Sequence, residues 1–179
     1  MTEAASVYGE ALYELAKDEN MSDLMLMQLK ALNESFAAEP DFVRLLSAPN
    51  LSKVERKQIL DTCFKGKTQP YLLNFLKILM EKGYIRQFSS CVQVFHELYN
   101  KDHGIMPVSV VTAVPMSDSQ KEKLASKLAG ITGKQIDLTN TIDPACIGGV
   151  RLDYDGKRVD DTIIHRLDAV SSMLKNTIL

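Results

Sequence analysis

The chain has 179 residues, of which 45% are hydrophobic and 25% charged, close to the average for soluble globular proteins, so disordered and collagen-like chains are excluded. With 21 basic and 23 acidic side chains the formal net charge is −2, so the chain lacks the broad positive field that binding to a nucleic-acid backbone usually needs. The longest unbroken apolar run, Leu24 to Met27, is four residues, which excludes a membrane-spanning helix of about 20 residues.

Residues 1–104 are predicted to be helical, because their apolar residues recur at three- and four-residue spacing. Ser52 and Glu55 have the spacing of a capping box, in which each side chain bonds the other residue's backbone. The expected helices are Ser6–Lys17, one capped near Asn20–Ser22, Asp41–Leu46, one from Ser52 that stops at Gly66, one from Pro70 to just before Gly83, and Ile85–Asn100. Six short amphipathic helices with brief connections predict a compact bundle.

From Ile105 onward the pattern changes to short β-rich segments and helices. Asp155-Gly156 is a strong signal for a two-residue hairpin turn. In chain order we expect a strand over Pro107–Pro115, a helix from a capping box at Ser117 to Gly130, strands over Gln135–Ile142 and Ile147–Tyr154, a short strand at Arg158–Val159, and a last helix capped by Asp160 or Asp161 with a stripe of Ile163, Leu167, Val170 and Leu174. This order is β-α-β-β-α.

Two features interrupt the predicted strands. Asn140 falls on the apolar side of its strand, where it breaks the alternation. Gly148 and Gly149 stand at the start of the third strand, where glycine predicts a bulge or a close approach of another backbone segment.

The predicted fold class is therefore α+β with two domains: a six-helix bundle over residues 1–104 and a small β-α-β-β-α domain over residues 105–179. Charge is uneven along the chain, since residues 1–47 carry 3 basic and 9 acidic side chains whereas residues 48–105 carry 9 basic and 5 acidic ones. Two explanations of this difference are open. Neighbouring helices carry solvated faces of complementary charge, or the charge steers a charged partner.

Catalytic and cofactor motifs are weak throughout. Cys63, Cys91 and Cys146 are an odd number without paired spacing, which argues against a disulfide framework and for a reducing compartment. None of them stands in a C-x-x-C pair, which argues against a zinc site. The segment Gly130–Lys134 has neither the spacing nor the following Ser or Thr of a phosphate-binding loop. The sequence thus indicates no cofactor and no metal.

Two other functions stay open at this point. A nucleic-acid-binding helical adaptor is suggested by the G-x-x-G spacing of Gly130 and Gly133 and by the positive charge of residues 48–105. An enzyme with Cys91 or Cys146 as nucleophile requires a thiol of lowered pKa.

Surplus apolar helix surface is the remaining functional signal. The first helix spreads Val7, Tyr8, Leu12 and Leu15 over a wide arc, and the helix after Pro70 is apolar almost all round. Such helices are either central to a bundle or expose a groove that accepts a partner's amphipathic helix.

Several segments together resemble the delta subunit of the rotary F-type ATP synthase, the homologue of the oligomycin sensitivity-conferring protein. Their order and spacing are similar over nearly the whole chain. The segments are Val7–Ala16 (YAxALFELA in the family), Leu46–Ser52 with Glu55–Lys57 (L-x-x-P-x-[IL]-S…E-x-K), Phe75–Gly83 (FLxLLxENGR), Val108–Ser117 (AEVTSAxPLS), Thr132–Lys134 with Asp143–Arg151 (TGKK…DPSLIGG), and Gly156–Thr162 with Arg166–Leu167 (GDRVIDGS…RL).

The resemblance implies a non-catalytic stator subunit rather than an enzyme. It implies that the N-terminal six-helix bundle sits on the catalytic head and holds N-terminal helices of alpha subunits, one of them in a groove between the first and fifth helices. It also implies that the C-terminal domain grips the C-terminal helices of the b-subunit stalk. Nucleic-acid binding and direct insertion into the membrane are not expected.

The resemblance also implies partner-binding residues. For the groove these are Tyr8 and Leu12 with Phe75 and Leu79; for the stalk contact they are Ile164 and Met173. The expected location is the cytoplasmic face of a bacterial membrane, as a peripheral part of the synthase, since the N-terminus shows no signal or transit peptide.

Overall fold

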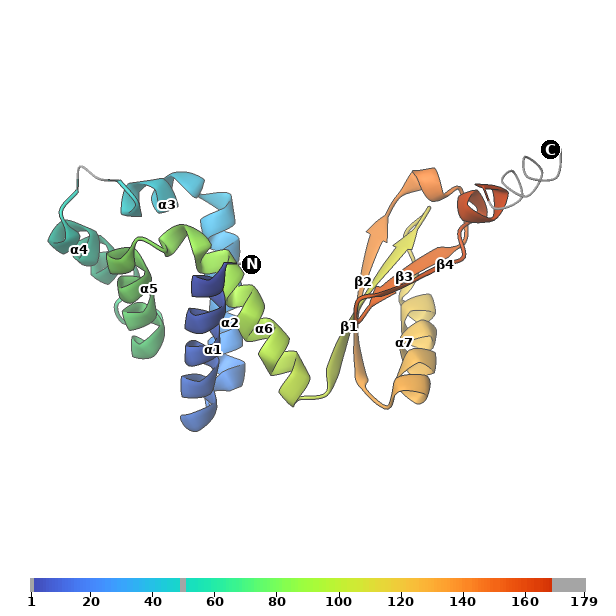
Figure 1. Ribbon diagram of the computed structural model, residues 1–179, viewed down its shortest axis with the longest axis horizontal. Helices are drawn as coiled ribbons and strands as arrows, with labels where there is room; N and C mark the ends of the chain where they lie inside the picture. The colour runs from blue at the N-terminus through green and yellow to red at the C-terminus, as the bar shows by residue number, and fades with distance from the viewer. Residues whose placement is uncertain (1, 49–50, 169–179) are drawn as a thin grey trace. The chain divides into compact units, whose positions relative to one another are not determined.

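A computed structural model describes residues 2–48 and 51–168, and it combines helices with a four-stranded sheet, which confirms an α+β chain (Figure 1). The chain separates into two compact units, Met1–Tyr99 and Asn100–Leu179, which are treated one at a time below. Over the described residues, no helix has both the length and the apolar character that crossing a membrane requires.

Unit 1 is built from helices whose ends follow local signals. Its elements are α1 (Glu3–Asp18), α2 (Ser22–Ala38), α3 (Pro40–Leu46), α4 (Lys53–Phe64), α5 (Pro70–Lys82), the short 3-10 helix η1 (Ile85–Gln87) and α6 (Phe88–Asp102). The predicted capping box is confirmed, since Ser52 Oγ accepts from Glu55 N at 3.2 Å while Ser52 N donates to Glu55 Oε2 at 2.8 Å. Gly83 ends α5 with φ of 80°, a left-handed conformation that glycine adopts without strain.

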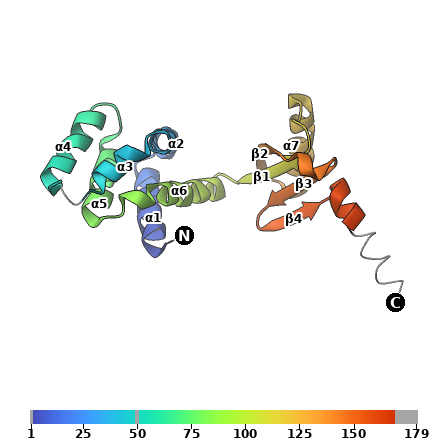
Figure 2. The same ribbon diagram turned by 90° about the horizontal axis from the view of Figure 1, so that it is seen from above.

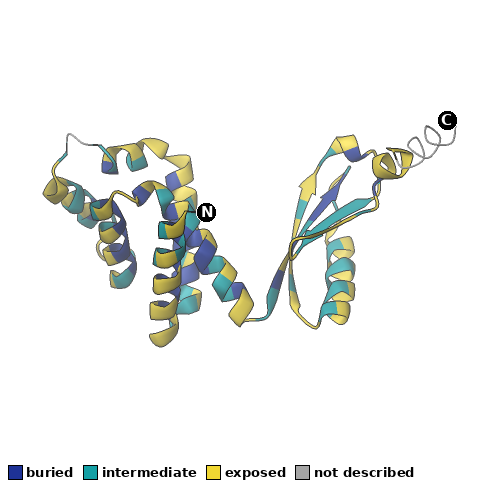
Figure 3. Cartoon of the chain, viewed as in Figure 1, coloured by how far each residue is buried: buried dark blue, intermediate teal, exposed yellow. Residues whose placement is uncertain are grey.

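These helices share one hydrophobic core. Leu29 of α2, Leu72 and Leu76 of α5 and Phe95 of α6 are fully buried in it. The dark blue residues of Figure 3 mark these inward-facing stripes, and the outer sides of the helices are yellow. Because their apolar residues recur at helical spacing, helices that are distant in sequence pack around one shared core.

A glycine lets α1 cross α6 at close range. A Cβ atom on Gly9 would lie 2.8 Å from Val94 Cβ and 2.9 Å from the Cys91 carbonyl oxygen. Tyr13 then packs edge-on against Phe95, with ring centroids 5.2 Å apart. This contact fixes α1, and with it the position of the outer face of α1.

Unit 2 is a sheet of strand order β2-β1-β3-β4 with one helix packed on it (Figure 2). Its elements are β1 (Ile105–Thr112), α7 (Asp118–Thr132), β2 (Gln135–Ile142), the 3-10 helix η2 (Pro144–Cys146), β3 (Val150–Tyr154) and β4 (Lys157–Asp160). β1 runs parallel to β2 and antiparallel to β3. Met106, Val108 and Val110 pack with Leu124 and Leu128 of α7, so α7 covers one face of the sheet.

The hairpin between β3 and β4 is confirmed as predicted. Tyr154 pairs with Lys157, and the two residues between them, Asp155 and Gly156, have φ of 47° and 71°. Positive φ at both central residues defines the turn type whose twist matches that of paired strands.

Helix α7 runs further than predicted. The sequence suggests an end at Gly130, but the helix continues to Thr132 and ends at Gly133, which has φ of 67° and donates its N–H to the Ala129 carbonyl at 2.8 Å. Gly130 is therefore an interior helical residue, and the later glycine takes the left-handed end position.

The cap of the last helix was also predicted wrongly. Residues 163–168 are helical, and Thr162 is the cap, because its Oγ1 accepts from His165 N at 3.3 Å. Asp160 instead supports this cap, as its Oδ1 accepts from the Thr162 N–H at 3.0 Å and the Thr162 hydroxyl at 2.7 Å. The predicted stripe positions Val170 and Leu174 lie outside the described residues.

Asn140 breaks the apolar alternation because it joins three segments by hydrogen bonds. Its Oδ1 accepts from Met116 N at 3.0 Å, and its Nδ2 donates to the Val110 carbonyl at 3.0 Å and to Thr112 Oγ1 at 2.9 Å. The side chain thus holds the loop before α7 against β1 and β2. A polar residue on this half-buried face is satisfied rather than misplaced.

Candidate partner-binding faces

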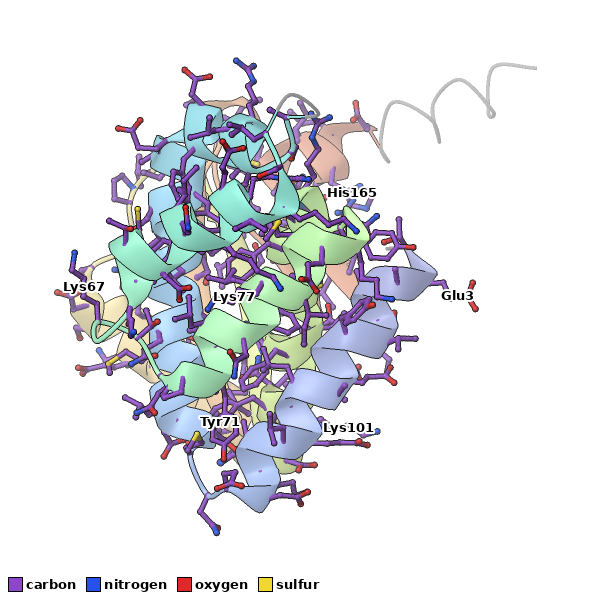
Figure 4. The ribbon with its side chains drawn as sticks, turned by 90° about the vertical axis from the view of Figure 1, so that its left-hand side faces the viewer. Glu3, Lys67, Tyr71, Lys77, Lys101 and His165 are labelled. Atoms are coloured by element: carbon purple, nitrogen blue, oxygen red, sulfur yellow. The ribbon has the colours of Figure 1, made fainter. Side chains whose placement is uncertain are left out.

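Helices α1 and α5 lie side by side in unit 1, as Figure 4 shows with Tyr71 and Lys77 labelled on α5 and Glu3 on α1. Tyr8 near the start of α1 contacts Tyr84 just after α5, with ring centroids 5.9 Å apart. At the opposite end, the charge of Glu19 and its hydrogen bond with the Tyr71 hydroxyl raise the pKa of Tyr71. Because the start of one helix meets the end of the other at both contacts, the two helices are antiparallel.

Most of the predicted groove residues lie beneath this pair of helices. Leu12 of α1 is 4% exposed, and Phe75 and Leu79 of α5 are 6% and 0% exposed, so all three belong to the core of unit 1. Tyr8 is half-buried at the seam between the helices. The structure therefore brings the four residues to the same pair of helices, with only Tyr8 reaching the outer surface.

The outer surface of the pair carries other apolar side chains. Val7 and Leu15 on α1 are 59% and 36% exposed, and Ile78 on α5 is 44% exposed. Spacing of four residues aligns Val7, Ala11 and Leu15 along one stripe, and spacing of seven aligns Tyr71 with Ile78. We call this surface the α1–α5 face, which consists of Val7, Tyr8, Ala11, Leu15, Ile78 and Tyr84.

The other side of α5 is charged. Lys77 Nζ lies 2.5 Å from Asp61 Oδ1 of α4, and Lys57 of α4 pairs with Glu81. The hydrogen bond from Lys57 lowers the pKa of Glu81. Ion pairs thus close the α4 side of α5, while apolar side chains remain on the α1 side.

A second apolar surface gathers where β1 and β2 end and β3 begins in unit 2. A pocket of about 400 Å³ lies there, with Val114, Met116, Ile147 and Val150 in its lining. We use the name sheet-end patch for the exposed apolar residues of the segments that meet at this end of unit 2: Val114 (70%), Ile142 (50%), Ile147 (63%), Ile163 (43%), Ile164 (40%) and Leu167 (57%).

Ile147 is held in a strained turn within the sheet-end patch. Its φ is 61° and its ψ is −41°, and Gly148 N donates to the Cys146 carbonyl at 2.6 Å across it. This is the rare γ-turn, and a β-branched residue with positive φ is an outlier. Strain of this kind concentrates at functional sites, and here it presents an exposed isoleucine.

The close approach predicted at the two glycines is confirmed beside this turn. A Cβ atom on Gly149 would lie 2.3 Å from the Asp161 carbonyl oxygen, and Gly149 has φ of 81°. Ile163 N donates to the Gly148 carbonyl at 3.0 Å, and Asp161 N donates to the Val150 carbonyl at 3.0 Å. The start of the last helix is thereby fastened to the start of β3.

The predicted stalk residues have different outcomes. Ile164 is exposed and belongs to the sheet-end patch, whereas Met173 lies outside the described residues. The residues predicted to bind partners did not include Ile147 or Ile78. A signal for Ile147 was available, since an apolar residue directly before two glycines marks an irregular, accessible segment.

The features that suggested other functions do not form sites in the described part of the chain. The G-x-x-G spacing belongs to the end of α7, with Gly130 inside the helix, so it is not a loop between two elements. Over residues 2–48 and 51–168, no cluster of three or more His, Cys, Asp or Glu could hold a metal ion.

Cys91 has the opposite of the environment that a nucleophile needs. It is 1% exposed, and burial raises the pKa of its thiol to about 11. Because only the thiolate reacts, iodoacetamide at pH 8 is expected to label Cys91 about a hundredfold more slowly in the native chain than in urea. Peptide mass spectrometry over time measures both rates, and equal rates would contradict the buried thiol.

Comparison with known proteins gives a consistent result. Residues 4–174 match the family described as ATP synthase delta (OSCP) subunit. The chain is 29% identical over 175 residues to ATP synthase subunit delta of Clostridioides difficile (strain 630), covering 97% of each chain. It is 30% identical over 168 residues to ATP synthase subunit delta of Lacticaseibacillus casei (strain BL23), covering 93% of this chain and 92% of the relative.

A solved structure has the same fold. A chain of the cryo-EM structure of the Toxoplasma gondii mitochondrial ATP synthase hexamer aligns with a TM-score of 0.74 and 21% identity, covering 97% of this chain and 98% of that chain. At this identity the likeness concerns the fold, and it extends over both units.

Proposed function

Since this chain belongs to the ATP synthase delta (OSCP) subunit family, a component of the F-type ATP synthase, we propose that it is the non-catalytic stator link of that complex. In this role it joins the catalytic head to the b-subunit peripheral stalk and resists the torque of the rotor. The observation that carries the proposal is that each of the two units exposes its own apolar surface, the α1–α5 face and the sheet-end patch.

Unit 1 is the proposed contact with the head. Helices α1–α6 act as one bundle that holds the N-terminal helix of an alpha subunit on the α1–α5 face. An amphipathic helix buries its apolar side against such a surface through residues at i, i+3, i+4 and i+7. Leu12, Phe75 and Leu79 support this face from the core, and Val7, Leu15 and Ile78 make the contact.

Unit 2 is the proposed contact with the stalk. The C-terminal helices of the b subunit dock on the sheet-end patch, where Ile147 and Ile164 serve as anchors and the pocket of about 400 Å³ accepts an apolar side chain. Met173 remains a proposed contact from the sequence alone. Anchors that fill pockets carry most of the binding energy in interfaces of this kind.

The proposed mechanism is mechanical. The rotor turning inside the head exerts an equal and opposite torque on it, so the tether must stay bound through many turnovers. At typical association rates, slow dissociation requires nanomolar affinity, about −12 kcal/mol for each contact. Hydrophobic docking supplies this affinity without covalent chemistry or a cofactor. The chain then lies at the cytoplasmic face of the membrane as a peripheral subunit.

A titration tests the head contact. The full chain is titrated with a synthetic peptide of the N-terminal segment of the alpha subunit from the same synthase, and heat release is measured by isothermal calorimetry. Saturable binding at one or more sites on unit 1 is expected. Absence of binding at 100 μM peptide, with the chain folded by circular dichroism, would contradict the proposal.

Ile147→Gly is expected to weaken stalk binding without lowering the stability of unit 2. Glycine adopts the backbone conformation of Ile147 without strain, so unit 2 should keep its stability or gain up to about 1 kcal/mol. Loss of the exposed side chain should weaken binding of a soluble C-terminal fragment of the b subunit about tenfold.

Calorimetry and urea unfolding measure the two effects of Ile147→Gly. Val159→Ala is the matched control, because Val159 is 48% exposed on β4 and lies outside the sheet-end patch. Unchanged affinity in Ile147→Gly would remove Ile147 from the stalk contact.

A further inference from the structure

One wall of the pocket of about 400 Å³ in unit 2 is the loop between β1 and α7. Residues 113–117 of this loop lie outside the helices and strands. Val114 and Met116 of the loop line the pocket together with Ile147, and the Val114 side chain is 70% exposed. Because the ladder of the sheet does not include this loop, other bonds have to fix where this wall of the pocket lies.

Two buried or half-buried polar side chains supply those bonds. Asn140 Nδ2 donates to Thr112 Oγ1 at 2.9 Å, and the Thr112 hydroxyl in turn donates to the Val114 carbonyl at 2.7 Å. On its other side, Asn140 Oδ1 accepts from Met116 N at 3.0 Å. We call these bonds the Asn140 network. Consecutive bonds that run in one direction polarise and strengthen one another.

The amide of Asn140 has only one workable orientation in this network. Its Nδ2 also donates to the Val110 carbonyl of β1 at 3.0 Å. Turning the amide over would set its NH₂ group against the Met116 N–H and its oxygen against the Val110 carbonyl, so donor would face donor and acceptor would face acceptor. The network thus ties the loop to β1 and β2 in a single arrangement.

The network also occupies polar groups at the rim of the pocket. The Val114 carbonyl and the Met116 N–H are both bonded inside the protein, and Gln120 of the pocket lining accepts from Ser117 N at 2.8 Å. A polar group that loses its water in an apolar contact without gaining a partner weakens that contact. The loop therefore presents the side chains of Val114 and Met116 with these backbone groups already paired.

We propose that Asn140 and Thr112 are positioning residues for the stalk contact. They act through Val114 and Met116, and they hold the pocket wall in the shape that an apolar side chain of the b-subunit helix meets on docking. A surface that is ordered before binding loses less conformational entropy on binding and so binds more tightly. This inference rests on the proposed function, which names the b subunit as the occupant of the pocket.

Two substitutions of Thr112 separate the hydroxyl from the size of the side chain. Thr112→Ser keeps the donor to the Val114 carbonyl, whereas Thr112→Val keeps the shape of threonine and removes the donor. Thr112→Val should weaken binding of the soluble C-terminal fragment of the b subunit about tenfold in calorimetry, and Thr112→Ser should bind within about twofold of the unmodified chain. Thr139→Val is the matched control, because Thr139 is exposed on β2 outside the sheet-end patch and should not affect binding.

Amide exchange measures the position of the loop without the partner. In the ¹⁵N-labelled full chain, Asn140→Leu should make the Met116 amide exchange at least about tenfold faster, because its acceptor is lost. Leucine suits the apolar side of β2, so the amides of β1 that pair with β2 and β3 should keep their protection. The same variant should weaken binding of the b-subunit fragment about tenfold or more.

The double variant Asn140→Leu with Thr112→Val tests whether the two residues act as one unit. Its loss of affinity should be smaller than the product of the two single losses, since both substitutions break the same network. Equal affinities of folded Thr112→Val, Asn140→Leu and unmodified chains, or an equal loss in Thr112→Ser and Thr112→Val, would overturn the positioning role while leaving the stalk contact intact. Absence of binding by the unmodified chain would overturn the stalk contact and the positioning role together.

Discussion

Replacing Ile78 with aspartate is expected to weaken binding of the alpha-subunit peptide at least tenfold, with little change in the stability of unit 1. Ile78 is 44% exposed at the centre of the α1–α5 face. In the complex the variant loses the burial of the part of the isoleucine side chain that is exposed in the free chain, about 0.7–1.3 kcal/mol, and it places an unpaired charge in an apolar contact. The two effects together exceed the free energy of a tenfold change, which is about 1.4 kcal/mol.

Two further variants make the Ile78→Asp result specific. Val54→Asp, at a 64% exposed position on α4, should bind the peptide normally. Phe75→Asp should unfold unit 1 instead, because Phe75 is 6% exposed and contacts Phe88. Normal binding by a folded Ile78→Asp chain would exclude the α1–α5 face as the head contact.

Replacing Gly149 with alanine is expected to destabilise unit 2 by about 3 kcal/mol or more. The methyl group would lie 2.3 Å from the Asp161 carbonyl oxygen and 2.9 Å from Thr162 Cα. Both are backbone atoms of a segment that is held in place by the hydrogen bonds of the Asp161 and Ile163 N–H groups to the Val150 and Gly148 carbonyls. A positive φ adds about 1–2 kcal/mol of conformational strain in a residue with a side chain. The start of β3 and the cap at Thr162 would have to separate.

Hydrogen exchange with mass spectrometry measures the Gly149→Ala effect separately for each unit of the full chain. Peptides from β1 and β3 should lose protection, and peptides from α2 and α5 should keep theirs. Gly156→Ala is the matched control, since Gly156 has φ of 71° but nothing within 4 Å of the added Cβ. It should cost only the strain of about 1–2 kcal/mol, and an equal effect of both variants would contradict the role of the Asp161 contact.

Features that depend on neighbouring residues were predictable from the sequence. Ser52 with Glu55 and Ser117 with Gln120 form the expected capping boxes, because the bonding groups are three residues apart. The hairpin at Gly156 follows from the same kind of local rule.

Features that depend on packing between distant segments were not predictable from the sequence. On α5, which is apolar almost all round, only the positions of α1, α4 and α6 decide that Phe75 and Leu79 are buried while Ile78 is exposed. The sequence indicated that another backbone segment approaches Gly149 closely. Which residue makes this approach was not predictable, because the register of the β3–β4 hairpin decides that it is Asp161. The cap at Thr162 depends on the same register, since Asp160 pairs with Arg151 and thereby fixes where the strand ends.

The most direct test of the account is a bridging measurement with purified parts of one synthase. The full chain is mixed with the catalytic head and with a soluble b-subunit dimer, and the masses of single complexes are measured in solution at nanomolar concentration. The account predicts a complex that contains head, chain and stalk, and that is absent when the chain is omitted. Binding of the chain to the head or the stalk alone, without the three-part complex, would contradict it.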